Sequence, residues 1–383
     1  MVKRMKSMKK EAGKRKQKHD QKDCRQDHHF MGLALELAAK GKGRTSPNPS
    51  VGAVIVRDGE VVGKGYHKKA GKAHAEISAI RSVKDKRLLK GSTLYITMEP
   101  CSHYGRTGPC TDAAIKAGIS RVVAAMIDPN PISNGRGFQL LRNAGIKVRS
   151  GVREDEARRL NEAYISFITT KKPFVLLKAA MSMDGKIATR TGSSKWISSK
   201  ESRRYAHKLR NDADAVMVGI NTALHDNPRL TCRIRGGKDP LRLILDSRLR
   251  IPLDSNILSD GNAMMATTNQ CDKEKKKKLE EMGIGVIVVN KRGKVRLKKL
   301  MKELSVRGII NVMIEGGSEV AASAVKEGIV DKVVYFVAPK IIGGSRAKTP
   351  IGGRGAGAME EVLTLRDVEL RKTGCDVIIE GYL

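Results

Sequence analysis

One histidine and two cysteines in the first half of the chain have the types and order of a catalytic zinc site. Glu76 stands two residues after His74, and Cys101 and Cys110 follow. One imidazole and two thiolates give Zn²⁺ three ligands and leave the fourth position for water. Zinc lowers the pKa of that water toward ~7, so hydroxide is available near neutral pH. The spacing predicts a hydrolytic zinc centre in which Glu76 moves protons and is not itself a ligand.

The positions of these residues argue against two simpler interpretations. A lone histidine is usually an ordinary polar residue, and a cysteine pair is often a set of buried apolar thiols or a structural zinc site. Here the His-x-Glu pair falls at an expected helix start, and Pro100-Cys101 falls at an expected strand end. Cys110 also begins an expected helix, whose dipole favours a thiolate. Eight residues separate the two cysteines, where the general nucleobase-deaminase signature has two.

The stretches around this motif predict a layered α/β domain over residues 27–151. Strands and helices alternate there, and Asp58-Gly59 between two apolar runs predicts a hairpin turn. The expected elements are a helix over 27–41, strands 51–56 and 61–66, a helix from 74, strand 93–97, a helix from 110, strand 121–127, a helix ending at 145 and strand 146–151.

The second half predicts another α/β domain with its own core. A chain of 383 residues exceeds one ordinary core, so two domains are the default. A charged linker helix is expected over residues 152–172, and the second domain over 173–383. Its expected strands are 174–179, 215–218, 241–246, 263–267, 285–289, 309–314, 332–338 and 375–383, and its expected helices are 199–210, 273–282, 297–304 and 319–326.

Charge and composition limit the classes of function. The formal net charge of +34 makes a polyanionic partner a real alternative, but 3% aromatic residues argue against a base-stacking surface. Residues 1–26 carry eleven Lys or Arg against three Asp or Glu and predict a disordered basic tail. The sequence shows no membrane-length apolar run and no disulfide-like cysteine spacing, so we expect a soluble cytoplasmic protein.

A glycine pair in the second half has two interpretations. Glu315-Gly316-Gly317-Ser318 ends an apolar strand and opens a helix, where backbone amides favour a phosphate. A simple tight turn has the same composition. The pattern is not the Gly-x-Gly-x-x-Gly fingerprint of a Rossmann unit. The residues alone therefore predict a phosphate- or nucleotide-binding α/β domain.

Longer motifs resemble those of one enzyme family. They cover residues 27–383 and are specific in combination: Asn48-Pro49-Ser50-Val51-Gly52, His74-Ala75-Glu76, Glu99-Pro100-Cys101 through Gly108-Pro109-Cys110, Asp128-Pro129-Asn130-Pro131, Ser182-Met183-Asp184-Gly185-Lys186, Trp196-Ile197-Ser198, Asp226-Asn227-Pro228-Arg229-Leu230-Thr231 and Glu315-Gly316-Gly317. Together they closely resemble the bifunctional deaminase/reductase family of riboflavin biosynthesis.

This resemblance implies two successive reactions. The N-terminal domain, similar to the cytidine-deaminase fold, would use one Zn²⁺ to deaminate 2,5-diamino-6-(5-phosphoribosylamino)pyrimidin-4-one. The C-terminal domain, similar to dihydrofolate reductase, would use NADPH to reduce the ribosyl group, giving 5-amino-6-(5-phosphoribitylamino)uracil. The expected partner is this small phosphorylated substrate, and a homo-oligomer is also expected.

The resemblance implies roles for further residues. Substrate contacts of the first site fall on Asn48, His67, His103 and Arg106. In the second site, NADPH contacts fall on Ala180, Trp196, Thr222, Asp226, Ser247, Gly317, Ser318, Glu319, Val320, Ala321, Ala322 and Ser323, and substrate contacts fall on Ser194, Arg210, Leu230, Arg233 and Glu315. Arg210 and Arg233 fit a bidentate clamp on the ribose phosphate. Asp226 and Glu315 are candidates to orient the reactants.

Two alternatives belong to other classes. The positive charge favours an RNA-editing zinc deaminase with a nucleic-acid-binding C-terminal domain, but the few aromatic residues, the cysteine spacing and the reductase-like motifs oppose it. A zinc-stabilised structural protein would unfold on metal loss, but no catalytic activity would be lost with the metal.

Overall fold

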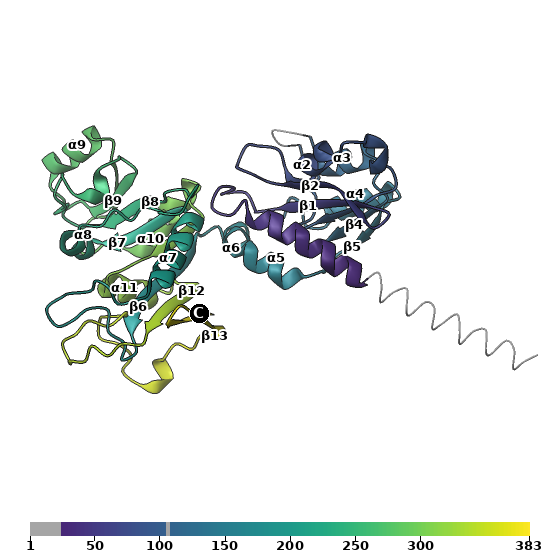
Figure 1. Cartoon of the computed structure of the whole chain (residues 1–383). Helices are drawn as coiled ribbons and strands as arrows, with labels where there is room; N and C mark the ends of the chain where they lie inside the picture. Colours follow the sequence, from purple (N-terminus) through teal and green to yellow (C-terminus); the bar gives the residue numbers. More distant parts are fainter. Residues whose placement is uncertain (1–23, 105–107) are drawn as a thin grey trace, which may run out of the picture. The chain divides into compact units, whose positions relative to one another are not determined.

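The computed structural model divides the chain into two compact units. The boundary lies between Thr169 and Thr170. Figure 1 shows the helices and strands of each unit. The structure describes residues 24–104 and 108–383, so residues 1–23 of the predicted basic tail lie outside the described residues. Within the described ranges, no helix is long and apolar enough to cross a membrane.

The first unit is built on a five-stranded sheet with the order β2-β1-β3-β4-β5. Its strands are β1 (Gly52–Arg57), β2 (Glu60–Tyr66), β3 (Thr93–Ile96), β4 (Arg121–Ala124) and β5 (Lys147–Arg149). β1 pairs antiparallel with β2 and β3, whereas β3, β4 and β5 are parallel. The predicted hairpin turn is confirmed: Asp58 and Gly59 both have positive φ, at 52° and 83°, as a two-residue turn of this kind requires.

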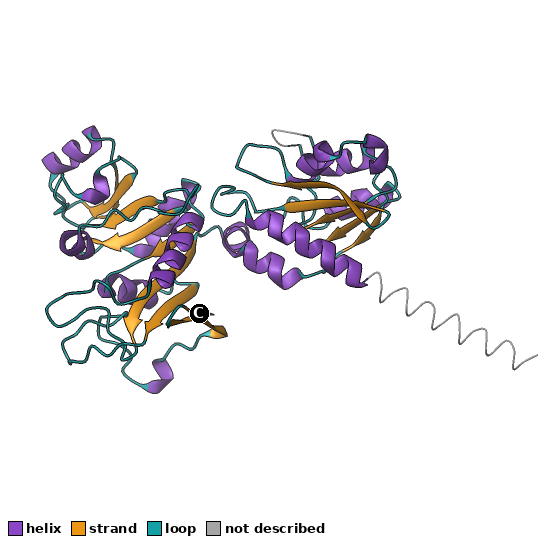
Figure 2. Cartoon of the chain, viewed as in Figure 1, coloured by secondary structure: helices purple, strands orange, loops and turns teal. Residues whose placement is uncertain are grey.

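Helices cover both faces of this sheet (Figure 2). They are α2 (Ala75–Ser82), α3 (Cys110–Lys116), α4 (Arg136–Asn143), α5 (Glu154–Leu160) and α6 (Glu162–Thr170), with a short 3₁₀ turn at Lys86–Leu89 and an N-terminal helix over residues 24–39. Ile55, Leu94 and Val122 share a buried cluster with α2, α3 and α4. The opposite face packs on the N-terminal helix, where a Cβ on Gly52 would lie only 2.0 Å from the carbonyl oxygen of Ala34.

The N-terminal helix begins earlier than predicted. Residues 24–26, assigned to the tail from the sequence, form its first turn. The buried carboxylate of Asp27 pairs with Arg121 at 2.7 Å and with Arg149 at 2.8 Å, and the Tyr95 hydroxyl donates to it at 2.9 Å. These long-range contacts fix this end of the helix on the sheet, and local composition does not reveal them.

The predicted single linker helix over residues 152–172 is two helices, α5 and α6. They meet at Asn161, whose buried amide accepts from the backbone N–H of Ser50 at 2.7 Å and donates to its carbonyl at 3.1 Å. The Tyr164 hydroxyl donates to the Asp128 carboxylate at 2.9 Å. These polar contacts hold both helices on the first unit.

The second unit contains a nine-stranded sheet with the order β10-β9-β8-β7-β11-β6-β12-β14-β13. Its strands are β6 (Phe174–Ser182), β7 (Ala215–Gly219), β8 (Leu241–Leu245), β9 (Ala263–Thr268), β10 (Gly285–Asn290), β11 (Asn311–Ile314), β12 (Lys332–Ala338), β13 (Arg366–Thr373) and β14 (Asp376–Tyr382). In this spatial order, each strand from β10 through β12 is parallel to its neighbour. β14 pairs antiparallel with β12 and β13. Ligands of such sheets bind outside the carboxyl ends of the parallel strands.

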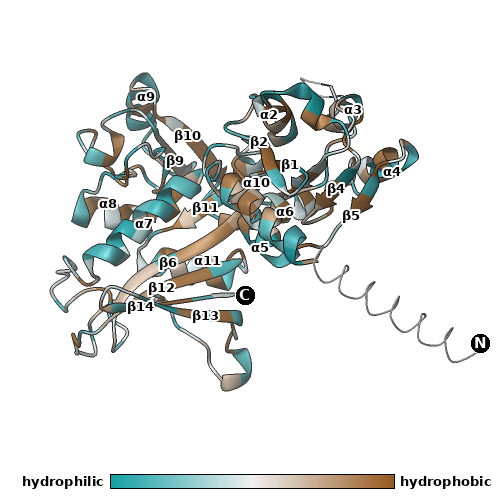
Figure 3. Cartoon of the chain, turned by 45° about the vertical axis from the view of Figure 1, so that its right-hand side comes forward, coloured by the Kyte–Doolittle hydropathy of each residue, from teal (hydrophilic) through white to brown (hydrophobic). Residues whose placement is uncertain are grey.

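Helices flank this second sheet. They are α7 (Lys200–Asp212), α8 (Ile220–Asp226), α9 (Lys273–Glu281), α10 (Leu297–Val306) and α11 (Ser318–Lys326), with 3₁₀ turns at Asn256–Leu258 and Met359–Glu361. Figure 3 shows α7 and α9 as largely hydrophilic, and α9 buries only Leu279. Such a helix needs few apolar residues because one side faces the sheet and the other faces water.

Candidate active sites

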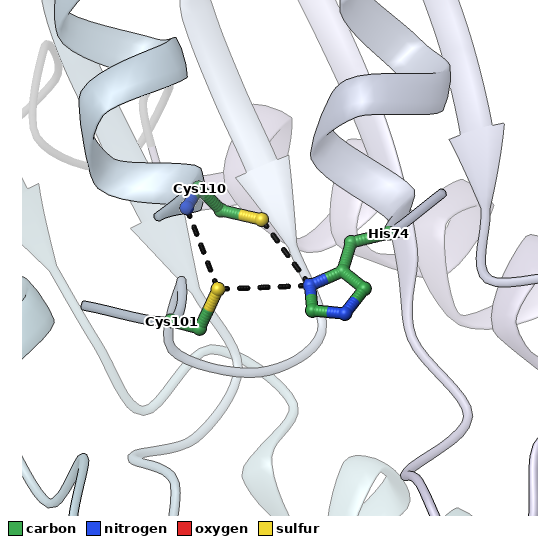
Figure 4. A group of neighbouring side chains, drawn as sticks. All are labelled: His74, Cys101 and Cys110. Atoms are coloured by element: carbon green, nitrogen blue, oxygen red, sulfur yellow. Dashed lines mark hydrogen bonds between the residues drawn. The ribbon is translucent and has the colours of Figure 1, made fainter. Parts of the chain in front are cut away.

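His74, Cys101 and Cys110 converge at one point of the first unit (Figure 4). Nδ1 of His74 lies 3.6 Å from Sγ of Cys101 and 3.3 Å from Sγ of Cys110. His74 is the N-cap of α2 and Cys110 is the first residue of α3, so two helix starts face the cluster as predicted. A tetrahedral zinc with bonds of ~2.0 to ~2.3 Å holds its ligand atoms about 3.5 Å apart, so the donor set fits the metal.

Glu76 lies in the first turn of α2 beside this cluster, and its side chain is buried. Burial raises the pKa of its carboxyl to about 7, and the nearby Cys101 thiolate adds to the rise. The hydrogen bond from the Cys110 thiol lowers the pKa of Cys101 to about 4, and the backbone N–H of Cys110 also donates to Sγ of Cys101 at 3.4 Å. These hydrogen bonds favour the thiolate of Cys101, the form that binds metal, and the raised pKa of Glu76 suits a group that both takes and gives a proton.

Two of the four predicted substrate residues of the first site lie beside the cluster. Nδ2 of Asn48 is 3.3 Å from Nε2 of His67, and the His67 ring stands edge-on to the His74 ring with centroids 5.4 Å apart. His103 is exposed on the loop after Cys101. Arg106 lies outside the described residues. The structure thus groups Asn48 and His67 with the metal ligands.

Glu99, which the sequence reasoning did not select, joins the loop that carries Cys101 to the loop after β4. Its Oε2 accepts from the backbone N–H groups of Asp128 at 3.1 Å and Gly135 at 2.8 Å, and its Oε1 accepts from Gly137 at 2.8 Å. The carboxylate is buried. The signal that could have found it is an acid that ends an apolar strand directly before Pro-Cys.

Glu99→Ala is expected to lower the free energy of unfolding of the first unit by about 3 kcal/mol, because three backbone donors lose their acceptor. Urea unfolding followed by circular dichroism measures this loss. Glu60→Ala, in the exposed hairpin, is the matched control and should change the free energy of unfolding by less than about 0.5 kcal/mol. Equal stability of the two variants would contradict the structural role assigned to Glu99.

The carboxyl ends of the parallel strands in the second unit enclose two connected cavities. Their volumes are about 640 Å³ and 1080 Å³, and they share lining residues that include Ser194, Thr222, Asp226 and Gly317. They therefore form one trough. Of the residues predicted from the sequence, the smaller cavity is lined by Ala180, Ser194, Trp196, Arg210, Thr222, Asp226, Leu230, Arg233, Glu315, Gly317, Ser318 and Ala321, and the larger one adds Ser247, Glu319, Val320 and Ser323. Ala322 lines neither cavity.

Arg210, which was predicted to clamp the ribose phosphate with Arg233, is paired within the protein, and the clamp stays a prediction. Its Nε and Nη2 donate to the two carboxylate oxygens of Glu315, both at 2.8 Å, and its Nη1 donates to the carbonyl of Thr231 at 3.0 Å. The guanidinium is therefore already used within the protein. Its partner is 105 residues away, so no local pattern reveals the pair. Arg233 remains exposed at the cavity.

Lys178 completes this ion group and was missed from the sequence. Its Nζ lies 3.2 Å from Oε1 of Glu315, and the side chains of Lys178 and Arg210 are both 13% exposed. Burial alone would raise the pKa of Glu315, but the charges of Arg210 and Lys178 outweigh it and lower that pKa to about 2. The sequence signal that could have identified Lys178 is a lysine inside the apolar run of β6.

The start of α11 lies in the middle of the trough. Gly317 is the N-cap of α11, and Gly316 before it has a φ of 120°, which glycine adopts without strain. A Cβ on Gly317 would lie 3.1 Å from Oγ1 of Thr222. Backbone donors at a helix start, with no side chain in front of them, fit the diphosphate of a dinucleotide.

These two sites define an enzyme class: a zinc aminohydrolase joined to an α/β reductase. Two family models match, the cytidine and deoxycytidylate deaminase zinc-binding region over residues 24–126 and the RibD C-terminal domain over residues 173–379. The riboflavin biosynthesis protein RibD of Aquifex aeolicus is 48% identical over 92% of this chain and 97% of its own length. Its Escherichia coli counterpart is 36% identical over 92% of this chain and 98% of its own length.

Solved structures agree with this assignment. RibD of Acinetobacter baumannii has a TM-score of 0.84 at 35% identity, covering 94% of this chain and 99% of that chain. The deaminase/reductase of Thermotoga maritima has a TM-score of 0.83 at 36% identity with the same coverage. The chain belongs to the RibD family of bifunctional riboflavin-biosynthesis enzymes, with Zn²⁺ and NADPH as cofactors. The predicted fold class is confirmed, and the RNA-editing alternative is not favoured.

Proposed function

We propose that the first unit deaminates 2,5-diamino-6-(5-phosphoribosylamino)pyrimidin-4-one and that the second reduces the deaminated product to 5-amino-6-(5-phosphoribitylamino)uracil. The observation that carries the first step is the convergence of His74, Cys101 and Cys110 beside the buried Glu76. Support for the substrate comes from the Thermotoga maritima protein, whose name states a diaminohydroxyphosphoribosylaminopyrimidine deaminase and a 5-amino-6-(5-phosphoribosylamino)uracil reductase.

In the first site, the chain positions the pyrimidine and moves protons. Zinc, when bound, supplies Lewis-acid activation of the attacking water. Glu76 takes a proton from that water at its carboxylate and returns it to the departing amino group, and a pKa of about 7 suits both roles. Asn48 and His67 lie where they can hydrogen-bond the ring. Ammonia leaves, and a carbonyl replaces the amino group.

In the second site, the chain holds two ligands in one trough. NADPH, when bound, supplies the reducing equivalents. Backbone donors at Gly317 and Ser318 would hold its diphosphate, and the Arg233 side chain at the cavity would be available to the ribose phosphate of the substrate. Glu315, fixed by Arg210 and Lys178, presents a charged group of defined position to the ribosyl end.

Cys101→Ser and Cys110→Ser are each expected to lower the zinc content at least about tenfold and to abolish ammonia release, because a serine hydroxyl is a poor zinc ligand. Metal analysis and an ammonia assay on the full chain measure both effects. NADPH oxidation with the deaminated substrate should stay near the wild-type rate. Cys271→Ser, in the second unit, is the control. Undiminished zinc in both site variants would refute the ligand assignment.

We propose residues 27–151 as the deaminase domain and 173–383 as the reductase domain, and the two family-model matches support this division. The homo-oligomeric state, the cytoplasmic location, the absence of nucleic acid among the partners and the disordered basic tail stay predictions from the sequence.

A further inference from the structure

The buried side chain of Asn161 joins the junction of α5 and α6 to the loop before β1. Asn161 is 4% exposed, its Oδ1 accepts from the backbone N–H of Ser50 at 2.7 Å, and its Nδ2 donates to the Ser50 carbonyl at 3.1 Å. Ser50 stands two residues after Asn48, which lies beside the metal ligands. We propose that Asn161 is a positioning residue of the deaminase site, because it fixes Asn48 for the substrate. The inference rests on the proposed function of that site and makes a residue of the expected linker part of it.

The Asn161 amide supplies Ser50 with hydrogen-bond partners that the sheet does not provide. β1 begins at Gly52, and within the described part of the chain Ser50 belongs to no strand pair. Ser50 is buried, and a buried backbone N–H or carbonyl without a partner is unfavourable. One carboxamide carries both an acceptor and a donor, so it satisfies both groups at once. The two bonds therefore fix the position and the orientation of the Ser50 backbone.

The chain between Ser50 and Asn48 is short and stiff. Asn48 stands between Pro47 and Pro49. A proline ring fixes its own φ near about −65° and also restricts the residue before it. The backbone N–H of Asn48 donates to the carbonyl of Thr45 at 2.8 Å, and Oγ1 of Thr45 lies 3.1 Å from Oγ of Ser50. A displacement of Ser50 is therefore transmitted to Asn48.

His67 fixes which end of the Asn48 amide faces the substrate. Nδ1 of His67 lies 3.1 Å from the carbonyl oxygen of Ala73, which can only accept, so Nδ1 carries the proton. Nε2 of His67 then has the lone pair and accepts from Nδ2 of Asn48 at 3.3 Å. Within the described residues, Oδ1 of Asn48 is free to accept an N–H group of the pyrimidine. Asn161 and His67 thus fix the backbone and the side chain of Asn48, respectively.

Asn161→Ala is expected to raise KM for the diaminopyrimidine substrate about tenfold and to leave kcat within about threefold of the wild-type value. A hydrogen bond between neutral groups changes a binding equilibrium by about this factor, and a contact equally strong in the ground and transition states affects KM alone. Zinc content should not change. A merely destabilised protein would instead lose kcat and zinc together at unchanged KM. Steady-state ammonia release and metal analysis of the full-length protein measure these effects.

Asn48→Ala tests whether Asn161 acts through Asn48. Alone, this substitution should raise KM about tenfold. Adding Asn161→Ala to it should raise KM by less than about twofold more, because both changes remove the same substrate contact. Losses that multiply to about a hundredfold in the double variant would overturn the proposal. So would an unchanged KM in Asn161→Ala.

Ser92→Ala is the matched control, because it removes a buried hydrogen bond of the same unit away from the zinc ligands. Ser92 is 1% exposed, and its Oγ donates to the Leu89 carbonyl at 2.7 Å. Ser92 precedes β3, whereas Cys101 follows the other end of that strand. The control should leave KM unchanged. If Asn161→Ala does not fold, Asn161→Asp, which keeps the volume and the acceptor for the Ser50 N–H, should raise KM about threefold.

Amide hydrogen exchange of the full-length protein gives a second readout that needs no turnover. The backbone N–H groups of Asn48 and Ser50 should exchange at least about tenfold faster in Asn161→Ala, while exchange in β3 should not change. Ser92→Ala should leave exchange at Asn48 and Ser50 as in the wild-type protein. If the wild-type protein released no ammonia from the diaminopyrimidine substrate, the proposed function would fail. Faster exchange at Asn48 and Ser50 would then still support the positioning role, and unchanged exchange would overturn it.

Discussion

Replacing Glu76 with glutamine is expected to slow ammonia release by about 10²- to 10⁴-fold while zinc stays bound. The amide has the shape of the carboxylate but cannot carry a proton from the attacking water to the leaving amino group. Glu76 is buried in the first turn of α2 and is not one of the three converging ligands, so the cluster should keep its metal. Steady-state ammonia release and metal analysis on the same sample measure both effects.

Glu60→Gln is the matched control for this prediction, because it makes the same chemical change at an exposed hairpin position of the first unit. It should leave ammonia release unchanged. A Glu76→Gln protein that lost its zinc would show that Glu76 holds the metal, and one with full activity would show that another group moves the proton.

The second large effect is expected for Glu315→Gln, which should lower the free energy of unfolding of the second unit by about 3 to 5 kcal/mol and abolish NADPH oxidation. The substitution leaves the positive charges of Lys178 and Arg210 in a site where both side chains are only 13% exposed. Glu303→Gln, which breaks the exposed pair between Glu303 of α10 and Arg307 at the C-cap of that helix, is the control and should cost less than about 0.5 kcal/mol. Similar losses in both variants, measured by urea unfolding, would contradict a buried ion group.

The same ion group predicts how stability depends on pH. The pKa of Glu315 is lowered from 4.5 to about 2 on folding, so its contribution to stability is complete above pH 4.5 and disappears as pH falls toward 2. The stability of the second unit should therefore fall over this window in the wild-type protein. In Glu315→Gln the fall in stability should be smaller. Equal slopes of stability against pH in both proteins would show that Glu315 does not cause this dependence.

The elements that were predicted correctly are those with strong local patterns. The Asp58-Gly59 turn and the apolar runs of β7, β9 and β12 can each be recognised from a few consecutive residues. The prediction missed α8, which has only seven residues and ends in the turn-like Asp226-Asn227, and it missed β13, whose residues are almost all exposed. An edge strand buries too little for hydrophobic periodicity to mark it.

Some residues of the candidate sites can likewise be predicted from local sequence, and others cannot. The metal ligands were predictable because zinc restricts the residue types, and the three lie within 36 residues of one another. The Arg210–Glu315 pair and the Glu99 contacts depend on which strands become neighbours, so they could not be read from local sequence.

The central claim is that one chain carries two chemically independent sites. The most direct test supplies Glu76→Gln with the already deaminated 5-amino-6-(5-phosphoribosylamino)uracil and NADPH, and follows NADPH oxidation. Substitutions in separate cores act independently, so we predict a rate within about twofold of the wild-type protein. A loss of NADPH oxidation as large as the loss of ammonia release would show that the two reactions share one site and would contradict this account.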